Sequence, residues 1–492
     1  MFDLLNFTIA APLLALAAGA LVVLLLDLLL PARSAHPLWF LFSLLSVVLA
    51  GYYLVPIWGK GYTGFGGSMV MDQFGLVFCL ILLVAAFLTI LLSFGRTEKD
   101  LSGYLALILW ATMGMMVMAT SGSLMTLFLG IELLSLAIYV AVAFDPQRPQ
   151  ALEAALKYFV LGSVASAVIL FGFAMIYGVS GTMNLAQIAE AARLSTGDLF
   201  YKVGLALAVA GLSFKMALVP FHTWAPDVYQ GAPTAVTAFM AVGTKTAAFA
   251  GLARFLLAAV PAEQQAALLL PLAVLAVLSM LLGSMVGIWQ NDLKRLMAYS
   301  GIAHAGYLVM GLPILGAEGL TAGAYYLAAY AFTAMGVFAI IALLEAEGKE
   351  GWEITSLTGF FFDRPVLGVS MALFMFGLAG LPPTGGFIGK VLLAKAAVGA
   401  NAWLLLVGLI LSTAISAYVY LRVVGQTIQK QAEAVEERQA VMAGGQEEEV
   451  GFSPAVVQFA LYLVLAVAVV GTLWLGVFPG GVVELLKATL LA

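Results

Sequence analysis

Charged residues are scarce in this sequence: Asp, Glu, Lys and Arg make up 10% of the 492 residues, whereas 63% are hydrophobic. Soluble globular domains carry about 25% charged residues, so the composition excludes that class. A membrane-spanning helix needs about 20 apolar residues, and the chain divides into about 14 such stretches. The sequence therefore predicts an all-α polytopic membrane protein with about 14 transmembrane helices.

Cysteine is almost absent, because Cys79 is the single one in the chain. A disulfide framework and a cysteine-based metal site are thereby excluded. The net charge of −5 indicates nothing about partners. Nucleic-acid binders concentrate basic residues and this chain does not, so we expect no nucleic acid as partner. The apolar composition makes the lipid bilayer the expected partner. Asp3 stands where a signal peptide would carry positive charge, and the following apolar run is long, so we expect the first span to be retained.

We number the loops between predicted spans in chain order. Lysine and arginine are more frequent in the odd-numbered loops than in the even-numbered ones. We assign Arg254 to an even-numbered loop. By the positive-inside rule the odd loops are cytoplasmic and both termini lie on the opposite side. Asp27 and Asp72 are expected at membrane interfaces. The GFGG run at 64–67 has no predicted strand beside it, so we interpret it as a turn and not as a nucleotide-binding loop.

The predicted span at 200–224 contains groups that a simple anchor would avoid. Lys215 lies within it, and Pro220 and His222 follow. Proline removes a backbone donor and clashes with the preceding turn, so the helix should be interrupted near Met216. Unwound backbone at membrane depth occurs where it is buried in protein or lines a wet cavity. The pattern favours an ion path over the alternative of a kinked helix, and His222 fits either a proton path or a cap on the broken helix.

The predicted span at 364–399 has the same oddity. Pro382 and Pro383 precede two glycines and should break the helix, and Lys390 follows the break. Two broken spans that each hold a lysine, five spans apart, are typical of transporters built from inverted repeats with sites at the breaks. We therefore predict two inverted five-helix repeats, spans 4–8 and 9–13, with spans 7 and 12 discontinuous.

Two further ionisable groups lie deep in predicted spans. Glu132 is flanked by apolar runs, and Ser135 and Tyr139 share its helical face. An acid at that depth is by default functional and faces a partner, although a structural hydrogen bond between helices is the alternative. Lys245 lies in the next span after the first break, and the hydroxyls of Thr234 and Thr237 on its face could bond it or hold water.

Three more candidates have stronger structural alternatives. Lys157 forms an i, i+4 pair with Glu153, which could equally be an ion pair at a helix end. Lys294 is most simply a positive-inside anchor. His304 lies on one helical face with a serine and a tyrosine, where it could relay protons or be a satisfied interior histidine; the other buried ionisable groups favour the relay.

Together these residues point to proton transfer. Buried lysines and carboxylates exchange protons when burial and neighbouring charges oppose each other. The set that we expect to be buried is Glu132, Lys157, Lys215, Lys245, His304 and Lys390.

Several segments resemble a known family. LFLGIELLSLAIYVAVAF, KMALVPFHTWAPDVYQGAPTAVTAF, NDLKRLMAYSGIAHAGY and LAGLPPTGGFIGK are similar to signature segments of the subunit N family of the proton-pumping NADH:quinone oxidoreductase, respiratory complex I. That family is related to the Mrp-type cation/proton antiporter subunits. The YQG of the second segment looks more like subunit N than like subunits L and M.

The resemblance implies roles for individual residues. It places a half-channel in each repeat, with Glu132 and Lys215 in the first, Lys245 as the link, and Lys390 as the terminal relay. The family's span-six lysine falls on Lys157. Three residues fall on polar motif positions with less certain roles: His222, Lys294 and His304.

The resemblance also implies the setting. NADH, FMN, iron–sulfur clusters and quinone would reside in partner subunits, and none in this chain. The neighbours would be subunit M and the small subunit K, in a bacterial plasma membrane. The chain would be part of an enzyme without a redox site of its own. A stand-alone or Mrp-type cation/proton antiporter is the alternative, and a scaffold that has lost transport is a third possibility.

We divide the chain into five parts: a three-helix segment (1–100), a first antiporter-like repeat (101–260), a second (261–428), a polar cytoplasmic loop (429–454) and a C-terminal helix (455–492). A short interfacial helix is expected within 181–199, because Leu185, Ile188 and Ala192 would share one face.

Overall fold

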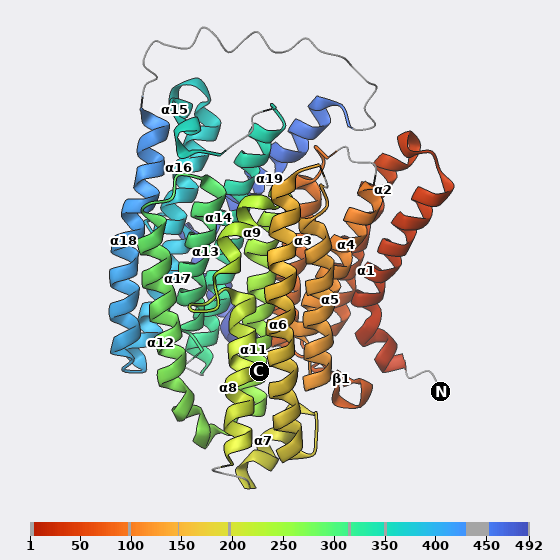
Figure 1. Cartoon of the computed structure of the whole chain (residues 1–492), viewed down its shortest axis with the longest axis vertical. Coiled ribbons are helices and arrows are strands. Elements are labelled where there is room, and N and C mark those ends of the chain that lie inside the picture. The colour runs from red at the N-terminus through yellow and green to blue at the C-terminus, as the bar shows by residue number, and fades with distance from the viewer. Residues whose placement is uncertain are drawn as a thin grey trace.

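A computed structural model describes residues 4–96, 100–145, 147–194, 198–312, 316–348, 352–429 and 452–490. Long helices run side by side through the molecule (Figure 1). Those of the N-terminal half are α1 (Leu4–Leu29), α2 (Ala32–Leu54), α3 (Gln73–Leu92), α4 (Leu101–Ala119), α5 (Leu124–Val142), α6 (Pro149–Ser180), α7 (Leu185–Leu194), α8 (Leu199–Met216), α9 (Trp224–Gly231), α10 (Thr234–Phe239) and α11 (Lys245–Ala259).

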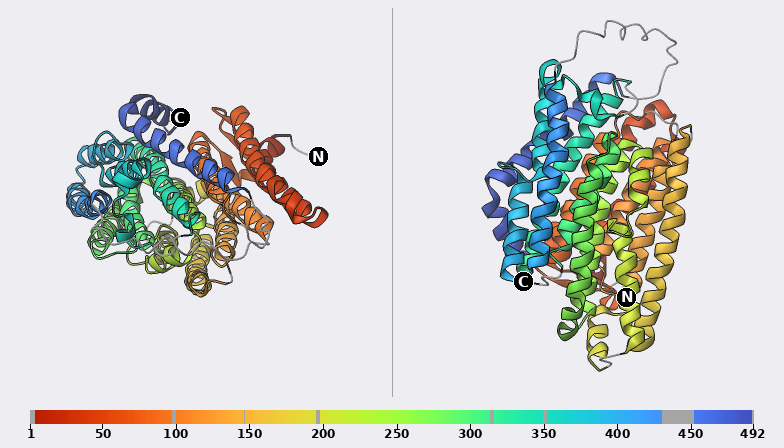
Figure 2. Two further views of the ribbon diagram at one scale, coloured as in Figure 1. Left: turned by 90° about the horizontal axis from the view of Figure 1, so that it is seen from above. Right: turned by 60° about the vertical axis from the view of Figure 1, so that its left-hand side comes forward.

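The helices of the C-terminal half are α12 (Ala262–Gly287), α13 (Leu293–Val309), α14 (Ala317–Glu345), α15 (Phe360–Asp363), α16 (Pro365–Ala379), α17 (Gly385–Gly399), α18 (Trp403–Ile428), α19 (Pro454–Val477) and α20 (Pro479–Leu490). A π-helical segment, Met240–Thr244, joins α10 to α11. Seen from above, α1 and α2 lie at one flank of the bundle and α18 lies at the other (Figure 2).

Within the described ranges, 12 helices are long and apolar enough to cross a membrane. The prediction of an all-α polytopic membrane protein is confirmed. The count of about 14 stays a prediction, because α13 and the two pieces α16 and α17 fall below the length of a full span. The sequence assigns α13 to span ten, and α16 and α17 together to span twelve.

A small hairpin corrects one expectation. Strands β1 (Tyr62–Gly64) and β2 (Met69–Met71) pair antiparallel on either side of the GFGG run. The run is a turn, as predicted, but it is flanked by strands. Gly66 and Gly67 adopt positive φ angles of 64° and 89°, which glycine reaches without a steric penalty.

Residues far apart in the sequence meet where α3 begins. Asp72 accepts a hydrogen bond from the Gly75 amide at 2.8 Å, so it caps α3. Its carboxylate also accepts bonds of 2.6 and 2.9 Å from Arg254. Arg254 was expected in a loop; instead it lies inside α11, is 8% exposed, and donates to the Ala119 carbonyl at 2.9 Å. This pair ties together α3, α4 and α11, and it removes Arg254 from the loop residues used for orientation.

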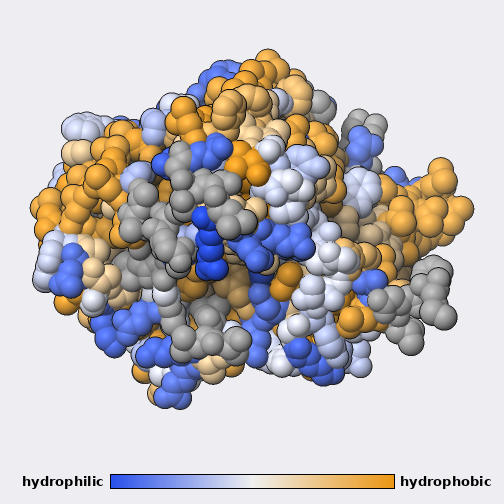
Figure 3. Space-filling view, turned by 90° about the horizontal axis from the view of Figure 1, so that it is seen from below, coloured by the Kyte–Doolittle hydropathy of each residue, from blue (hydrophilic) through white to orange (hydrophobic). Residues whose placement is uncertain are grey.

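The short helix α7 confirms that 181–199 contains a helix, with Leu185, Ile188 and Ala192 buried; its position at a membrane interface stays a prediction. It lies at the lower end of the bundle in Figure 1, which is also the end at which α1 begins (Figures 1 and 2). Viewed from that end, polar side chains gather in the middle and along one edge, while apolar ones cover much of the rim (Figure 3). An apolar rim is what a membrane-embedded bundle requires.

The span formed by α10, the π-helical segment and α11 lies at the centre of the molecule. Every residue from Gly231 to Leu256 is buried. By contrast, α6 and α18 expose large apolar side chains such as Phe171 (61%) and Ile410 (58%). The predicted polar loop at 429–454 falls mostly outside the described residues.

Candidate functional site: buried lysines along the bundle

Two helices are interrupted where the sequence predicts it. The last residue of α8 is Met216, and Ala217 follows in the left-handed conformation (φ 59°). The amide of Leu218 then donates to the Ser213 carbonyl at 3.0 Å. This closing pattern is the Schellman motif, which satisfies carbonyls at a helix end.

The second interruption repeats the first. Gly380 follows α16 in the left-handed conformation (φ 79°), and the amide of Leu381 donates to the Phe376 carbonyl at 2.9 Å. In both cases a proline comes three residues after the left-handed residue, and the peptide bonds Val219–Pro220 and Pro382–Pro383 are cis. Spans 7 and 12 are therefore both discontinuous, with the same local design.

Lys215 lies in the last turn of α8, beside the break, and is 3% exposed. Its ammonium donates to the Ser135 hydroxyl at 2.7 Å and to the Tyr139 hydroxyl at 3.3 Å, both on α5. The polar face predicted around Glu132 thus holds the lysine by neutral oxygens. A buried ammonium needs such acceptors, because burial without them is costly.

Glu132 lies one turn before Ser135 on α5 and does not touch Lys215. Among the described residues no ion pair joins the two. The Oε1 atom of Glu132 is buried and has no hydrogen-bond partner within the described chain. An unpaired carboxylate oxygen inside a protein is unfavourable, so this residue is poised for a partner.

Lys157 departs from the expectation of burial. Its side chain is 43% exposed at the surface of α6, and its ammonium lies 2.8 Å from Glu153 and 2.8 Å from Asp227. The predicted i, i+4 pair is confirmed, and Asp227 of α9 is an additional partner. Asp227 also accepts a 2.7 Å bond from Arg295 of α13, so one carboxylate connects α6, α9 and α13.

Lys245 is 2% exposed and stands at the first position of α11, directly after the π-helical segment. It donates to the Tyr229 hydroxyl at 2.7 Å. The threonine hydroxyls that the sequence suggested as partners are used elsewhere. Thr237 donates to the Tyr229 carbonyl at 3.2 Å, and Thr234 donates to Glu345 at 2.5 Å.

His304 is 2% exposed and both of its ring nitrogens are hydrogen-bonded. Nδ1 shares a 2.6 Å bond with the Tyr326 hydroxyl, and Nε2 shares a 3.2 Å bond with the Tyr420 hydroxyl. Tyr420 in turn bonds Ser300 at 2.7 Å. A neutral imidazole has one donor and one acceptor. The chain of hydrogen bonds from Tyr326 through His304 to Tyr420 can therefore exchange donors and acceptors without losing a bond.

Lys390 lies on α17 and reaches back across the second break. Its ammonium donates to the carbonyls of Ala379 (2.9 Å) and Leu378 (3.3 Å), at the end of α16. It also lies 4.6 Å from the centre of the Tyr307 ring. Because the carbonyl end of a helix carries partial negative charge, the break creates a site for a cation.

Lys294 corrects the expectation of a surface anchor. It is 2% exposed, pairs with Glu345 at 3.2 Å, and donates to the Ala232 carbonyl at 3.3 Å. The corner between α9 and α10 is therefore held by a buried lysine that pairs with a partly exposed glutamate.

His222 lies in the turn between α8 and α9, and its Nδ1 has no hydrogen-bond partner among the residues described. The indole of Trp224 donates to the Phe214 carbonyl at 3.0 Å. The side chain that bonds the end of α8 there is therefore Trp224.

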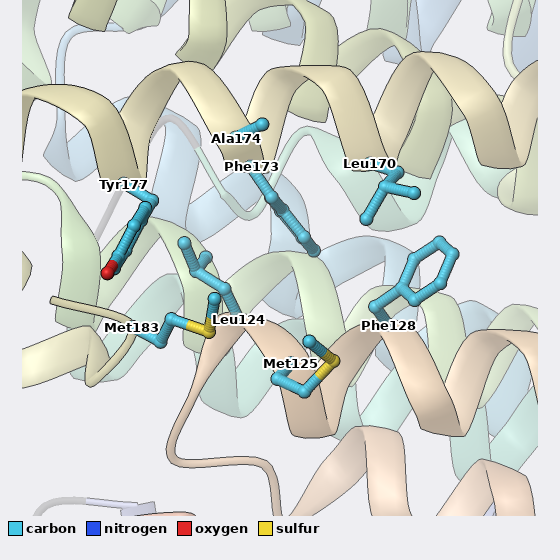
Figure 4. A pocket seen from close by; sticks show the side chains of 8 residues that line it. All are labelled: Leu124, Met125, Phe128, Leu170, Phe173, Ala174, Tyr177 and Met183. Atoms are coloured by element: carbon cyan, nitrogen blue, oxygen red, sulfur yellow. The ribbon is translucent and has the colours of Figure 1, made fainter.

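Other features of the bundle offer no comparable chemistry. Among the described residues, no group of three or more His, Cys, Asp or Glu could hold a metal ion. An apolar crevice of about 130 Å³ opens between α5, α6 and the segment before α7 (Figure 4). Its lining includes Leu124, Met125, Phe128, Leu170, Phe173 and Met183. The phenol of Tyr177 is the one titratable group among its lining residues.

Sequence reasoning missed three partners. Tyr229 and Asp227 belong to a segment whose prolines suggested a break and gave no hint of which face would point inward. Glu345 lies at the end of a predicted span, and nothing in its local sequence indicates a partner. The signal available for Asp227 was its position in the same interrupted segment as Lys215 and His222.

Comparison with known proteins agrees with this geometry. The family model described as "NADH:quinone oxidoreductase/Mrp antiporter, TM" matches residues 121–416. NADH-quinone oxidoreductase subunit N 1 of Symbiobacterium thermophilum is 58% identical over 494 residues, covering 99% of each chain. Subunit N of Trichlorobacter lovleyi is 40% identical over 432 residues, covering 86% of this chain and 88% of the relative.

Solved structures agree as well. A chain of respiratory complex I from Thermus thermophilus with bound aureothin superposes with a TM-score of 0.78 at 34% identity, covering 97% of this chain and 100% of that one. A chain of the Mrp complex from Dietzia sp. DQ12-45-1b gives a TM-score of 0.84 at 21% identity, covering 99% and 97%; at that identity the likeness shows the fold alone. With the interrupted helices and the buried lysines, these matches establish that the chain belongs to the subunit N family of NADH-quinone oxidoreductase, within the NADH:quinone oxidoreductase/Mrp antiporter proteins.

Proposed function

We propose that this chain moves protons across the membrane through two half-channels joined by buried lysines, as a membrane-arm subunit of a NADH:quinone oxidoreductase. The observation that carries the proposal is that Lys215, Lys245 and Lys390 are all buried and all bonded to neutral oxygens. A lysine held by hydroxyls and carbonyls keeps acceptors for its charged form without a fixed counter-ion. It is therefore suited to gaining and losing a proton.

The first half-channel would contain Glu132 and Lys215, and the second Lys390 with His304 before it. Movement of the Glu132 carboxylate toward Lys215 would favour the charged lysine, and movement away would release its proton toward Lys245. Lys157, Lys294 and His222 would act at the edges of this route. The two repeats would comprise residues 101–260 and 261–428, and each would then contain one of the interruptions.

The driving reaction would take place in other subunits, which would hold NADH, FMN, iron–sulfur clusters and quinone. Its membrane neighbours would be subunits M and K. The chain would lie in a bacterial plasma membrane with both termini on the non-cytoplasmic side. The start of α1 and the end of α20 lie toward the same end of the bundle, which supports the placement of both termini on one side of the membrane.

Replacement of single relay residues tests the proposal. In vesicles with the reconstituted complex, Lys245→Ala and Glu132→Ala should each lower proton translocation while the complex stays assembled. Glu347→Gln is a suitable control, since Glu347 pairs with Arg364 at the surface and is on no part of the proposed route. Undiminished pumping by the assembled Lys245→Ala complex would contradict a proton relay through Lys245. Undiminished pumping by Glu132→Ala would show that Glu132 has only a structural role.

The alternative of an Mrp-type or stand-alone antiporter predicts a different assembly. Purification in mild detergent distinguishes the two, because the proposed subunit should co-purify with an assembly that oxidises NADH. A chain that exchanges cations for protons in vesicles on its own would support the antiporter instead.

A further inference from the structure

Two tyrosine hydroxyls lie near the ammonium of Lys245: that of Tyr229, to which it is bonded, and that of Tyr330. In the structure its ammonium is bonded to Tyr229 of α9, in the first repeat. On the other side lies Gly301 of α13, in the second repeat. A side-chain carbon built on Gly301 would stand 2.9 Å from the Lys245 ammonium and 3.5 Å from the Tyr330 hydroxyl. The lysine and Tyr330 therefore converge on the space that this glycine leaves free.

The hydroxyl of Tyr330 is an unusual group at this position. Tyr330 is 3% exposed, and its hydroxyl has no hydrogen-bond partner among the residues described. A buried hydroxyl without a partner is unfavourable, and buried tyrosines usually find one. Its ring also contacts the ring of His304, with centroids 4.8 Å apart. Tyr330 thus stands between Lys245 and the hydrogen-bonded histidine.

The backbone before Lys245 is also irregular. The π-helical segment Met240–Thr244 ends directly before it. Such segments occur mostly as single turns and are frequent at functional sites. One extra residue in the turn changes the direction of the side chain that follows. The lysine's long stem then needs only a change of rotamer to turn from one repeat toward the other.

We propose that Lys245 alternates between two phenol partners, Tyr229 of the first repeat and Tyr330 of the second, across the space left by Gly301. The inference rests on the proposed function, and adds the residue that receives the proton. In the second position the N–H proton of Lys245 moves to the Tyr330 oxygen while the hydroxyl proton of Tyr330 leaves for the Nε2 atom of His304. For this step Nε2 exchanges its 3.2 Å bond with Tyr420 for one with Tyr330, and Tyr420 keeps its bond to Ser300. Lys245 becomes a neutral amine, Tyr330 remains a phenol, and His304 carries the charge onward toward Lys390.

The test compares variants of the complete complex in membrane vesicles, with translocation measured per NADH oxidised. Tyr330→Phe removes the hydroxyl and adds no volume. It should lower translocation by about tenfold or more, since a positioned proton donor contributes about 100-fold or more to such a step. Gly301→Ala should do the same by filling the space. Assembly and NADH binding should be unchanged in Tyr330→Phe.

Two matched controls separate this role from general damage. Tyr325→Phe removes a buried hydroxyl from the same helix, where it donates to the Leu475 carbonyl. Gly425→Ala adds a methyl group where nothing lies within 4 Å. Both should translocate at the unmutated level.

The outcomes also separate this inference from the function it rests on. Full translocation by assembled Tyr330→Phe complex, with Lys245→Ala still defective, overturns the second phenol and leaves the relay standing. Full translocation by Lys245→Ala removes both.

Discussion

The ammonium of Lys294 lies 3.2 Å from the Glu345 carboxylate, at the point where α10, α13 and α14 meet. The same carboxylate accepts bonds from Thr234 at 2.5 Å and from the Trp352 indole at 3.2 Å. Lys294 is the more buried partner, 2% exposed against 32% for Glu345. The lysine therefore depends on Glu345 more than the reverse.

Glu345→Gln should destabilise the protein by about 1–3 kcal/mol, because it leaves a buried ammonium without its anion. The midpoint of thermal unfolding in detergent measures the effect. Glu347→Gln is the control, since its pair with Arg364 is about one-third exposed on both sides and surface pairs contribute about 0–1 kcal/mol. Equal losses in the two variants would contradict the special role of Glu345.

Lys390 allows its structural and transport roles to be separated. Lys390→Arg keeps a positive charge at the end of α16 but does not release a proton in proteins, since the guanidinium pKa exceeds about 12. We expect near-normal assembly and thermal stability with loss of translocation. Lys390→Met should lose both, because the carbonyls of Leu378 and Ala379 lose their donor. Translocation by Lys390→Arg would show that proton release at this position is dispensable.

Acid should weaken the connection made by Asp227. The hydrogen bond from Lys157 is the main cause that lowers the pKa of the Asp227 carboxyl below its ordinary 3.8, with Arg295 acting in the same direction and burial against it. A lowered native pKa stabilises the fold above the unfolded-state value, and this contribution disappears as pH falls through the native pKa.

The difference in thermal midpoint between the unmutated protein and Asp227→Asn should thus be constant near neutral pH and shrink below about pH 4. A difference that persists undiminished at about pH 3 would show that the carboxylate charge is not what stabilises this corner.

Asp72 has two structural roles that a comparison can resolve. Asp72→Asn and Asp198→Asn both alter an N-cap, because Asp198 caps α8 through the amides of Phe200 and Tyr201. Only Asp72 also holds a buried arginine. We expect Asp72→Asn to cost about 1–3 kcal/mol more than Asp198→Asn, measured as thermal unfolding midpoints. Translocation per assembled complex should be unaffected, and equal midpoints would argue that Arg254 is satisfied by the Ala119 carbonyl alone.

The interruptions of the helices were predictable because proline and glycine act locally. Pro220 and the Pro382–Pro383 pair fix the breaks through missing donors and backbone clashes, whatever the helix packs against. The buried lysines were found for a similar reason, since a charge within an apolar run stands out in the sequence alone.

The partners of those lysines were not predictable, because they depend on how the helices are arranged. Thr237 is on the expected face of Lys245, yet threonine in a helix readily bonds nearby backbone carbonyls, and Tyr229 takes the lysine instead. Arg254 and Asp72 are 182 residues apart in the chain. Lys157 lies in an apolar run like the others, but the run faces outward, so its exposure follows only from the packing of α6.

The burial of every residue from Gly231 to Leu256 has a consequence for the response to lipids. A bilayer that is thicker or thinner than the protein's apolar rim acts on the helices at its perimeter, which tilt or shift to match it. In this molecule those are helices such as α6 and α18, whose apolar side chains are exposed. The helix that carries Lys245 has no lipid contact along that stretch, so a change in membrane thickness reaches the lysine only after its neighbours have repacked.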